Sequence, residues 1–398
     1  MLNRQDAIVR ELVVAYGEIA AAPRQSERLS RRSRFVDCAA ASARELAIDP
    51  PDLLDEVYAV LANARAAADR APAPWSLHLR AHLGRLQARG RSTVAAWRCR
   101  VGLRRYDLSI AELADRARSR SRDPAAPLFS IVILSCGRLE YLRHTLAGLV
   151  LSDGGARWEL IVVDNGSPPE QVWYLRACAQ AGAIDKLLLS PTNRGISAGY
   201  NVGFAAADRS TSYYVKLDSD NVILDRGWMG ALHAAFASSD AAIIALDQVN
   251  HPRLAALPAL ARDGRFKSWR GWVCGACAMT IPREIFDRFG CFSEDFDFAY
   301  NPDDADYYIR LETAGYAAYY LRSHRGYHQG YLDRSEYARV AQQKHQSATN
   351  YAAAMQRLQR AYFTGRRSIH RVYPEYDRSA WPAGARVVEL GPSLAAKG

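Results

Sequence analysis

Short apolar runs that alternate with helix-like segments dominate the chain from residue 129 onward. Four of the runs have the length of β-strands, namely residues 129–134, 158–163, 186–189 and 213–217. The segments between them have the length and composition of helices, namely residues 139–151, 170–181 and 197–207. Strands that are apolar throughout and alternate with helices predict a mostly parallel sheet with helices on both faces. In such a sheet, ligands bind beyond the carboxyl ends of the strands.

The first 120 residues carry a different pattern. Apolar residues recur at three- and four-residue spacing in segments 6–20 and 52–68, which predicts amphipathic helices. The stretch RSRSRDPAAP at 118–127 is polar and contains proline, as linkers often do. A basic helix is expected over 335–362. We therefore expect four regions: an α-helical, Arg- and Ala-rich region of open role (1–120), a linker (121–128), an α/β domain (129–333), and a C-terminal helix and tail (334–398).

The charge of the chain is uneven along its length. The net charge is +10, and residues 1–126 hold 22 Arg and no Lys against 15 acids, which gives this part +7. A basic region can contact nucleic acid, anionic lipid or an acidic partner. Because charges of both signs are interspersed here, we interpret the region as a solvated helical surface and expect no nucleic-acid contact.

Membrane and redox signals are weak. No apolar run approaches the roughly 18 to 20 residues that cross a bilayer, and the N-terminal apolar stretch is broken by charges, unlike a secretory signal. The seven cysteines are scattered, which favours reduced thiols and a cytoplasmic location. Peripheral contact at the inner membrane face stays open through the basic C-terminal helix. Its weak, Ala-rich apolar face favours packing on the sheet instead.

Acidic residues follow two of the predicted strands. Asp164 comes after the second strand, and Asp218 and Asp220 come after the fourth. Each acid alone is typical of a helix or turn cap, but their order on one alternating pattern indicates a site. In an extended segment, Asp218 and Asp220 point the same way and can face one cation. Carboxylate oxygens suit Mg²⁺ or Mn²⁺, which neutralises the charge of a departing diphosphate.

A second acidic cluster follows residue 300. It contains Asp303, Asp304 and Asp306, and close acids repel unless a cation lies nearby. Asp306 and Arg310 have the helical spacing of a structural ion pair. Asp303 and Asp304 then lie at the helix N-terminus, where free amides keep a carboxylate ionised and able to accept a proton.

Taken in order, these motifs resemble those of an inverting family 2 glycosyltransferase of the GT-A fold, over residues 129 to about 330. The motifs are the segments 130–135, 163–167, 193–203, 218–220, 275–280, 283–286, 290–294 and 303–316, followed by His328. The resemblance implies a GT-A fold preceded by the helical region. It also implies a nucleotide-sugar donor, UDP-linked by default with dTDP- and GDP-sugars open, and Mn²⁺ or Mg²⁺ as cofactor.

The resemblance also assigns roles to individual residues. Ser135 and Asp164 are expected to contact the nucleoside of the donor. Asn193 and Arg194 are expected to lie along the donor, and Asp218 is expected to approach the ribose. Asp220 is expected to hold the metal. Asp304, the second member of the acidic pair, is expected to be the general base. His328 falls where many members place a histidine near the diphosphate or the metal, with His324 as the alternative.

The acceptor is less well specified. Trp269, Arg270 and Trp272 are candidates, because tryptophans stack on sugars and arginine grips phosphate, and Asp303 is a fourth. The acceptor itself, a hydroxyl on a glycan, lipid-linked saccharide, protein or small molecule, stays open. Asp303 stands where the family usually has Glu. Ser135-Cys136-Gly137-Arg138 stands where it often has Thr-Tyr-Asn-Arg, so the contacts to base and ribose differ.

Two other functions were weighed. A sugar-phosphate nucleotidyltransferase should have a Gly-rich phosphate loop after the first strand, where this chain has Ser-Cys-Gly-Arg-Leu. A catalytically silent protein that binds a partner through its basic region need not keep Asp218, Asp220 and Asp304. Cys274 and Cys277 have the spacing of a redox or half-zinc motif, but no second pair accompanies them.

Overall fold

The computed structural model describes residues 4–22, 25–70, 103–251, 254, 257–261, 263–268, 277–294, 303–331, 355–371, 376 and 386–391. The acceptor candidates Trp269, Arg270 and Trp272 lie outside these residues, as do Cys274 and residues 335–354 of the expected C-terminal helix. Asp303 is described as the start of a helix, without its side chain.

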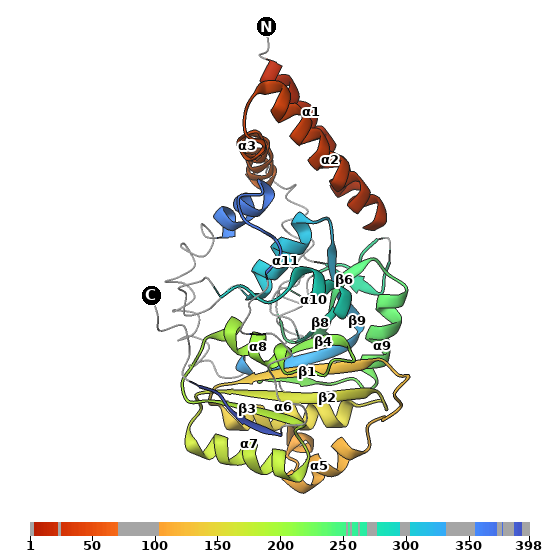
Figure 1. Cartoon of the computed structure of the whole chain (residues 1–398). Helices are drawn as coiled ribbons and strands as arrows, with labels where there is room; N and C mark the ends of the chain where they lie inside the picture. The colour runs from red at the N-terminus through yellow and green to blue at the C-terminus, as the bar shows by residue number, and fades with distance from the viewer. Residues whose placement is uncertain are drawn as a thin grey trace.

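The apolar runs form the parallel half of a central sheet (Figure 1). Strands β1 (Leu128–Ser135), β2 (Arg157–Asn165), β3 (Lys186–Ser190) and β4 (Thr211–Asp218) lie in the order β3-β2-β1-β4. A short strand from the C-terminal tail, β10 (Val387–Glu389), pairs in parallel with β3. The carboxyl ends of β1, β2, β3 and β4 therefore meet at one edge of the sheet.

The other half of the sheet is mixed. Strand β4 pairs antiparallel with β8 (Cys277–Pro282), which pairs antiparallel with β6 (Ala241–Gln248). Strand β6 runs parallel to β9 (Ala317–His328), and β5 (Asn221–Ile223) and β7 (Phe266–Lys267) pair antiparallel with β9. Strand β9 thus carries His328 back to the turn that follows β4.

Helices cover both faces of the sheet, as the uninterrupted apolar strands predict. Alternate residues of β1 point to opposite sides, since Ile131 and Ile133 belong to one buried cluster and Val132 to the other. The first cluster includes α5 (Ile110–Arg118), α6 (Leu139–Ser152), α7 (Pro169–Ala181) and α9 (Trp228–Ala237). The second includes α8 (Ile196–Ala205), α10 (Arg283–Phe289) and α11 (Asp303–Thr313).

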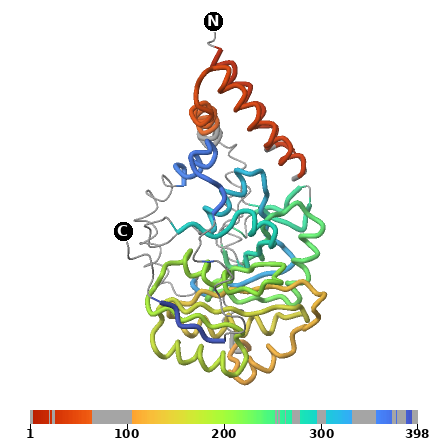
Figure 2. Tube along the Cα trace, in the orientation of Figure 1, coloured from red at the N-terminus to blue at the C-terminus, as the bar shows by residue number. Residues whose placement is uncertain are grey.

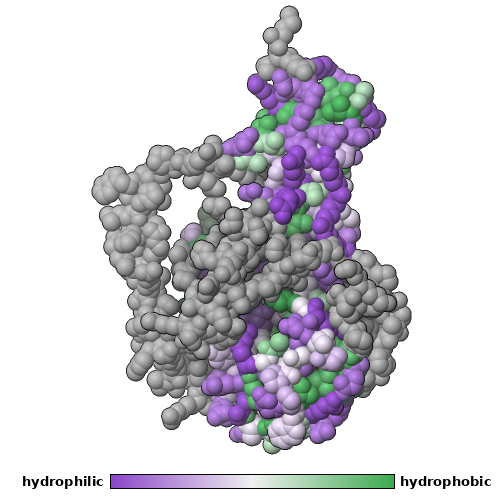
Figure 3. Space-filling view, turned by 90° about the vertical axis from the view of Figure 1, so that its left-hand side faces the viewer, coloured by the Kyte–Doolittle hydropathy of each residue, from purple (hydrophilic) through white to green (hydrophobic). Residues whose placement is uncertain are grey.

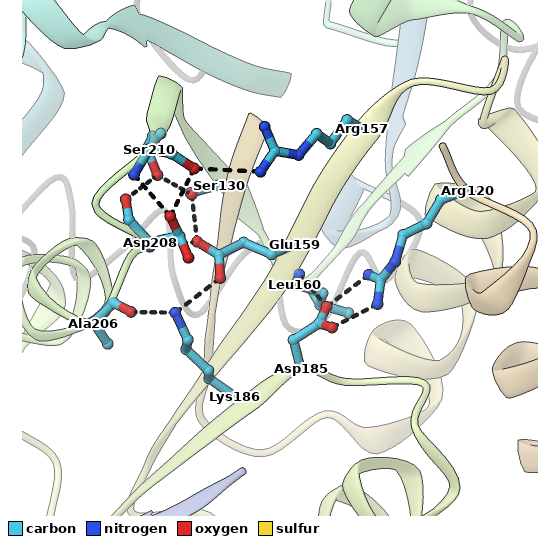
Figure 4. Close-up of polar contacts among 11 residues, drawn as sticks. Arg120, Ser130, Arg157, Glu159, Leu160, Asp185, Lys186, Ala206, Asp208 and Ser210 are labelled. Atoms are coloured by element: carbon cyan, nitrogen blue, oxygen red, sulfur yellow. Dashed lines mark hydrogen bonds and ion pairs between the residues drawn. The ribbon is translucent and has the colours of Figure 1, made fainter. Parts of the chain in front are cut away.

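A buried polar network crosses the sheet near the amino ends of its strands, away from the predicted site (Figure 4). The Glu159 carboxylate accepts hydrogen bonds from Ser130 Oγ at 2.5 Å, Lys186 Nζ at 2.9 Å and the Asp208 amide at 2.6 Å. Beside it, Asp185 accepts from both terminal nitrogens of Arg120, at 2.6 and 2.5 Å. Because each carboxylate has several charge-assisted partners, we interpret this network as structural.

The predicted N-terminal helices form a unit of their own at one end of the molecule (Figures 1 and 2). Helices α1 (Arg4–Ala21), α2 (Gln25–Leu46) and α3 (Pro50–Arg70) pack around a small apolar cluster that includes Leu12, Phe35 and Val57. Their surface in Figure 3 is mostly hydrophilic, with small hydrophobic patches. None of the described helices is long and apolar enough to cross a membrane.

The chain after residue 354 connects the N-terminal helices to α11. Residues 355–363 are helical, and Phe363 lies in the apolar cluster of the N-terminal helices, with its ring centroid 5.0 Å from that of Tyr16. On its other side, this helix contacts α11, and the Tyr362 hydroxyl donates to Asp306 Oδ1 at 2.6 Å. The position of α11 therefore depends on segments far from it in the sequence.

The ion pair predicted between Asp306 and Arg310 is confirmed, and it is fully buried. Arg310 Nε lies 3.1 Å from Asp306 Oδ2, and both side chains are 0% exposed. Arg310 also donates to the backbone carbonyl oxygens of Phe289 at 2.8 Å and Cys291 at 2.7 Å. These bonds anchor α11 to the loop after α10.

Candidate functional site at the carboxyl ends of the strands

Ser135 and Asp164 end neighbouring strands and are partners in the register of β1 and β2. Both side chains are buried. Gln171 on α7 fixes this corner, because its Nε2 donates to Ser135 Oγ at 2.5 Å and to Ser167 Oγ at 3.0 Å. The structure therefore brings together the two residues that the sequence places at a nucleoside.

Asp164 has one satisfied carboxylate oxygen and one unsatisfied one. Its Oδ2 accepts from the Ser167 amide at 3.2 Å, whereas its buried Oδ1 has no hydrogen-bond partner among the described residues. Burial raises the pKa of Asp164, against hydrogen bonds from Ser167 and Gly166 that lower it. A buried acceptor without a partner costs free energy, so Oδ1 is a candidate contact for a ligand N–H or O–H group.

The loop that carries Asn193 and Arg194 is held by a residue that the sequence analysis did not single out. Asn165 Nδ2 donates to Asn193 Oδ1 at 3.0 Å, and Asn165 Oδ1 accepts from the Arg194 amide at 2.7 Å. The next residue, Gly166, has φ 79°, and a Cβ there would lie 2.8 Å from the Asn193 backbone nitrogen. The sequence signal for this role of Asn165 is the polar Asn165-Gly166 pair at the end of a buried strand, which is typical of a turn.

Asn193 and Arg194 differ in exposure within this loop. Asn193 is exposed, and its Nδ2 donates to Cys136 Sγ at 3.5 Å. Arg194 is half-buried, and its Nε is buried with no hydrogen-bond partner among the described residues. A buried guanidinium donor without a partner in this loop suits an anionic ligand group, since arginine binds phosphate well.

Asp218 lies at the end of β4 with two hydrogen-bond donors. Lys216 Nζ donates to its Oδ1 at 2.9 Å, and the Tyr200 hydroxyl donates to the same oxygen at 2.8 Å. Burial acts to raise the pKa of Asp218, but the adjacent Lys216 ammonium and these hydrogen bonds outweigh it and lower the pKa. Asp218 is thus held as a carboxylate.

Asp220 lies in the turn between β4 and β5 and has different partners. Arg138 Nη1 donates to its Oδ2 at 3.0 Å, and His328 Nε2 lies 3.6 Å from its Oδ1. The Asp-x-Asp spacing predicts that Asp218 and Asp220 lie in one extended segment. The strand instead ends at Asp218, since the chain turns there, so alternation along a strand does not apply to Asp220.

His328 is brought to Asp220 by the pairing of β9 with β5. His328 pairs with Asn221, and Asn250 holds its backbone by donating to the carbonyl oxygen at 2.7 Å and accepting from the amide at 3.0 Å. His324, the alternative, lies earlier on β9, where its Nδ1 is 2.9 Å from Ser323 Oγ. The geometry therefore favours His328 over His324.

Asp304 lies in the first turn of α11, as the sequence predicts. Its Oδ1 accepts from the Ala305 amide at 2.8 Å. The burial of Asp306 and Arg310 on the same helix fixes the direction of this turn.

The residues at this edge of the sheet fit a divalent cation with few protein ligands. No group of three His, Cys, Asp or Glu side chains gathers as a metal site within the described part of the chain. Asp220 and His328 together offer an oxygen and an imidazole nitrogen, which leave several cation positions for the oxygens of a diphosphate. The pair therefore matches a cation that binds together with a phosphorylated ligand.

Fold and site together define an α/β protein with polar groups gathered at the carboxyl ends of its parallel strands, where ligands of such folds bind. Residues 130–286 match the sequence model of glycosyl transferase family 2. The resemblance to this family is thereby confirmed over those residues, and so is the predicted fold, a GT-A type α/β domain preceded by a helical region. No curated protein matches the chain.

The solved structures that the chain resembles have low sequence identity and TM-scores below 0.5. The mannosyltransferase PcManGT from Pyrobaculum calidifontis, in complex with GDP-Man and Mn²⁺, is 17% identical, with a TM-score of 0.42 over 63% of this chain and 67% of that one. TarS 1–349 of S. aureus is 15% identical, with a TM-score of 0.37 over 51% of this chain and 60% of that one. Its complex with UDP-GlcNAc is 13% identical, with a TM-score of 0.38 over 50% and 58%.

Proposed function

We propose that this protein is a metal-dependent, inverting glycosyltransferase that moves a sugar from a nucleotide-diphosphate sugar to an acceptor hydroxyl. The observation that carries the proposal is the Asp220 carboxylate between Arg138 and His328, at the same edge of the sheet as the unsatisfied Asp164. The Asp220 carboxylate with its two neighbours suits a metal-bound diphosphate. The unsatisfied oxygen of Asp164 suits a nucleobase. The family match over 130–286 supports the reaction class.

The donor is proposed to bind along the ends of four strands, β1, β2, β3 and β4. Asp164 Oδ1 would accept from an N–H group of the base, with Ser135 beside it on the nucleoside. Asp218 would contact the ribose, and Asn193 and Arg194 would lie along the donor. UDP stays the default nucleotide and dTDP stays open, because one free carboxylate oxygen suits the single ring N–H that uracil and thymine share. The catalytic unit is proposed to be residues 129–333, to which α5 and β10 add from outside these bounds.

Asp220 and His328 are proposed to hold Mn²⁺ or Mg²⁺. The cation would supply charge neutralisation for the departing diphosphate. Asp304 is proposed to remove the proton from the acceptor hydroxyl. The hydroxyl oxygen forms a bond to the anomeric carbon from the face opposite the diphosphate, and the bond from that carbon to the diphosphate oxygen breaks. Positioning and electrostatic stabilisation would supply most of the rate. Trp269, Arg270, Trp272 and Asp303 remain the proposed acceptor contacts.

Calorimetric titration of UDP, GDP and dTDP, each with and without Mn²⁺, tests this function directly. Wild type is expected to bind one nucleotide in a Mn²⁺-dependent manner, and Asp220→Asn is expected to lose that dependence. Asp225→Asn is the matched control, because Asp225 forms an ion pair with Arg325 at 2.9 Å outside the site. If folded wild-type protein binds none of the three nucleotides, the proposed donor site is wrong.

The role of Asp304 is tested in the same series. Asp304→Asn is expected to bind the nucleotide as wild type does but to release little nucleotide diphosphate from the matching sugar donor, because a general base typically contributes roughly 10²- to 10⁴-fold to the rate. Wild-type rates in Asp304→Asn would exclude Asp304 as the base.

A further inference from the structure

Arg138 has an unusual backbone conformation directly after β1. Its φ is 59° and its ψ is 51°, which is the left-handed region, at the residue before α6. This region is unfavourable for a residue with a Cβ, and arginine lacks the short polar side chain that lets Asn or Asp occupy it. The side chain of Arg138 makes no capping hydrogen bond to α6 that would account for the conformation. Unfavourable backbone conformations of this kind cluster at functional sites.

The left-handed turn places the Arg138 guanidinium against the Asp220 carboxylate. Nη1 donates to Asp220 Oδ2 at 3.0 Å, and Cζ lies 5.9 Å from the ring centroid of Tyr141. The Asp220 side chain is only 7% exposed, whereas that of Arg138 is 41% exposed. The carboxylate end of this ion pair is thus buried, and the guanidinium end is partly exposed.

The same carboxylate is one of the two groups proposed above to hold a cation. Its other oxygen, Oδ1, faces His328 Nε2 at 3.6 Å. An arginine keeps its charge at all ordinary pH values, so Asp220 is neutralised by Arg138 whenever the two are in contact. A divalent cation that binds Asp220 has to compete with this guanidinium.

We propose that Arg138 is a positioning residue that couples the cation to the nucleotide, an inference that rests on the proposed function. In the protein without nucleotide, Arg138 holds Asp220 and weakens its affinity for a divalent cation. When a nucleotide diphosphate is present, the guanidinium moves from Asp220 to a phosphate oxygen, because its planar donors fit phosphate well. Cation and nucleotide then strengthen each other's binding by the same factor.

Arg138→Gly is the informative variant, because glycine adopts the left-handed conformation without strain and the substitution should not impair folding. Binding of Mn²⁺ alone is measured by calorimetry and by the paramagnetic resonance signal of free Mn²⁺. Affinity in the absence of nucleotide is expected to rise roughly three- to tenfold, as when a partly exposed ion pair no longer competes. With Mn²⁺ at saturation, the affinity for the nucleotide diphosphate is expected to fall.

Two further variants separate charge from backbone effects. Arg138→Lys keeps the positive charge and the backbone strain, and its Mn²⁺ affinity is expected to stay close to that of wild type. Arg176→Ala removes an arginine of similar exposure on α7, which pairs with Glu389, and is expected to change neither affinity.

The outcomes distinguish this inference from the proposed function. Unchanged or weaker Mn²⁺ binding in Arg138→Gly, with nucleotide binding intact in wild type, overturns the role of Arg138 alone. An increase that persists in the Arg138→Gly, Asp220→Asn double variant also overturns it, because the cation then lies elsewhere. A wild-type protein that binds no nucleotide diphosphate overturns the proposed function and this inference with it.

Discussion

Two aspartates at the ends of β2 and β4 lie in opposite electrostatic settings. Asp218 accepts from Lys216 and Tyr200, and its pKa is lowered. Asp164 has an unsatisfied oxygen, and burial raises its pKa. The residue type alone does not distinguish the two, since both follow apolar strands. Their difference arises from Lys216, which is on the same strand as Asp218 and has no counterpart beside Asp164 among the described residues.

The two settings predict opposite effects of the same substitution on stability. At pH 7, Asp164→Asn is expected to raise the free energy of unfolding by roughly 1 kcal/mol, because it removes a poorly compensated buried charge. Asp218→Asn is expected to lower it by a similar amount, about 1 kcal/mol, because it removes a carboxylate that Lys216 stabilises. Urea unfolding of both variants at pH 7 provides the measurement.

The two aspartates are expected to change stability in opposite directions as the pH falls. A raised pKa in the folded state means that stability due to Asp164 is present at low pH and is lost as the pH rises through that pKa. A lowered pKa means that stability due to Asp218 is present above its unfolded-state pKa and is lost as the pH falls through the folded-state pKa. The gain in Asp164→Asn should therefore shrink on acidification. Destabilisation by Asp164→Asn at pH 7 would contradict this account.

At the scale of elements, α11 is the helix whose placement matters most for the proposed base, Asp304. Its periodicity and the spacing of Asp306 and Arg310 were visible in the sequence. The partners of this pair were not, because the carbonyl oxygens of Phe289 and Cys291 and the hydroxyl of Tyr362 come from other segments. Because this ion pair is buried and hydrogen-bonded to those segments, it holds α11 against them.

Two ion pairs with the same spacing permit a matched test. Arg310→Met leaves Asp306 buried without its cation, and we expect a loss of about 3–5 kcal/mol in the free energy of unfolding. Arg283→Met breaks the Arg283–Asp287 pair, which has the same 3.1 Å distance but side chains that are 45% and 52% exposed, and we expect a loss of about 0.5 kcal/mol or less. Denaturant unfolding measures the free energy of unfolding of both variants and of wild type. Equal losses would show that burial does not determine the energy of these pairs.

At the scale of the whole molecule, the N-terminal helices are attached to the α/β domain at two places. Arg28 forms an ion pair with Asp240 and donates to the carbonyl oxygen of Gly315 at 3.3 Å. Asp55 on α3 accepts from Arg360 at 2.8 Å and from Arg366. Helix 355–363, which carries Arg360, also contacts α11. It therefore links Asp55 on α3 to the helix that carries the proposed catalytic base.

This arrangement predicts that a substitution on α3 affects a distant helix. Burial acts to raise the pKa of Asp55, but Arg360 and Arg366 outweigh it and lower the pKa. Its stabilising contribution is therefore lost as the pH falls through the lowered pKa. We expect Asp55→Asn to accelerate amide hydrogen exchange in residues 355–363 at neutral pH, because opening of this helix becomes easier.

Glu45→Gln is the matched control for this experiment. Glu45 forms an ion pair with Arg4 within the N-terminal helices, with side chains that are 49% and 74% exposed, and it does not contact helix 355–363 among the residues described. We expect no change in exchange there. Equal exchange in Asp55→Asn and wild type would argue against attachment through Asp55.

The sequence by itself determined the parts of this protein that depend on local pattern. Apolar runs specified β1, β2, β3 and β4, because a strand buried on both faces must be apolar throughout. Polar residues after these runs indicated where Asp164 and Asp218 would lie, because parallel strands end at one edge. Helical spacing identified the Asp306–Arg310 pair.

Tertiary structure alone decided the features that join distant segments. It placed β10 beside β3, chose His328 rather than His324 as the neighbour of Asp220, separated the partners of Asp218 and Asp220, and brought Arg138 to Asp220. Each depends on strand pairing or on a turn that reverses the chain. The spacing of apolar residues along the chain indicates which residues are buried. It does not indicate which distant segment packs on them.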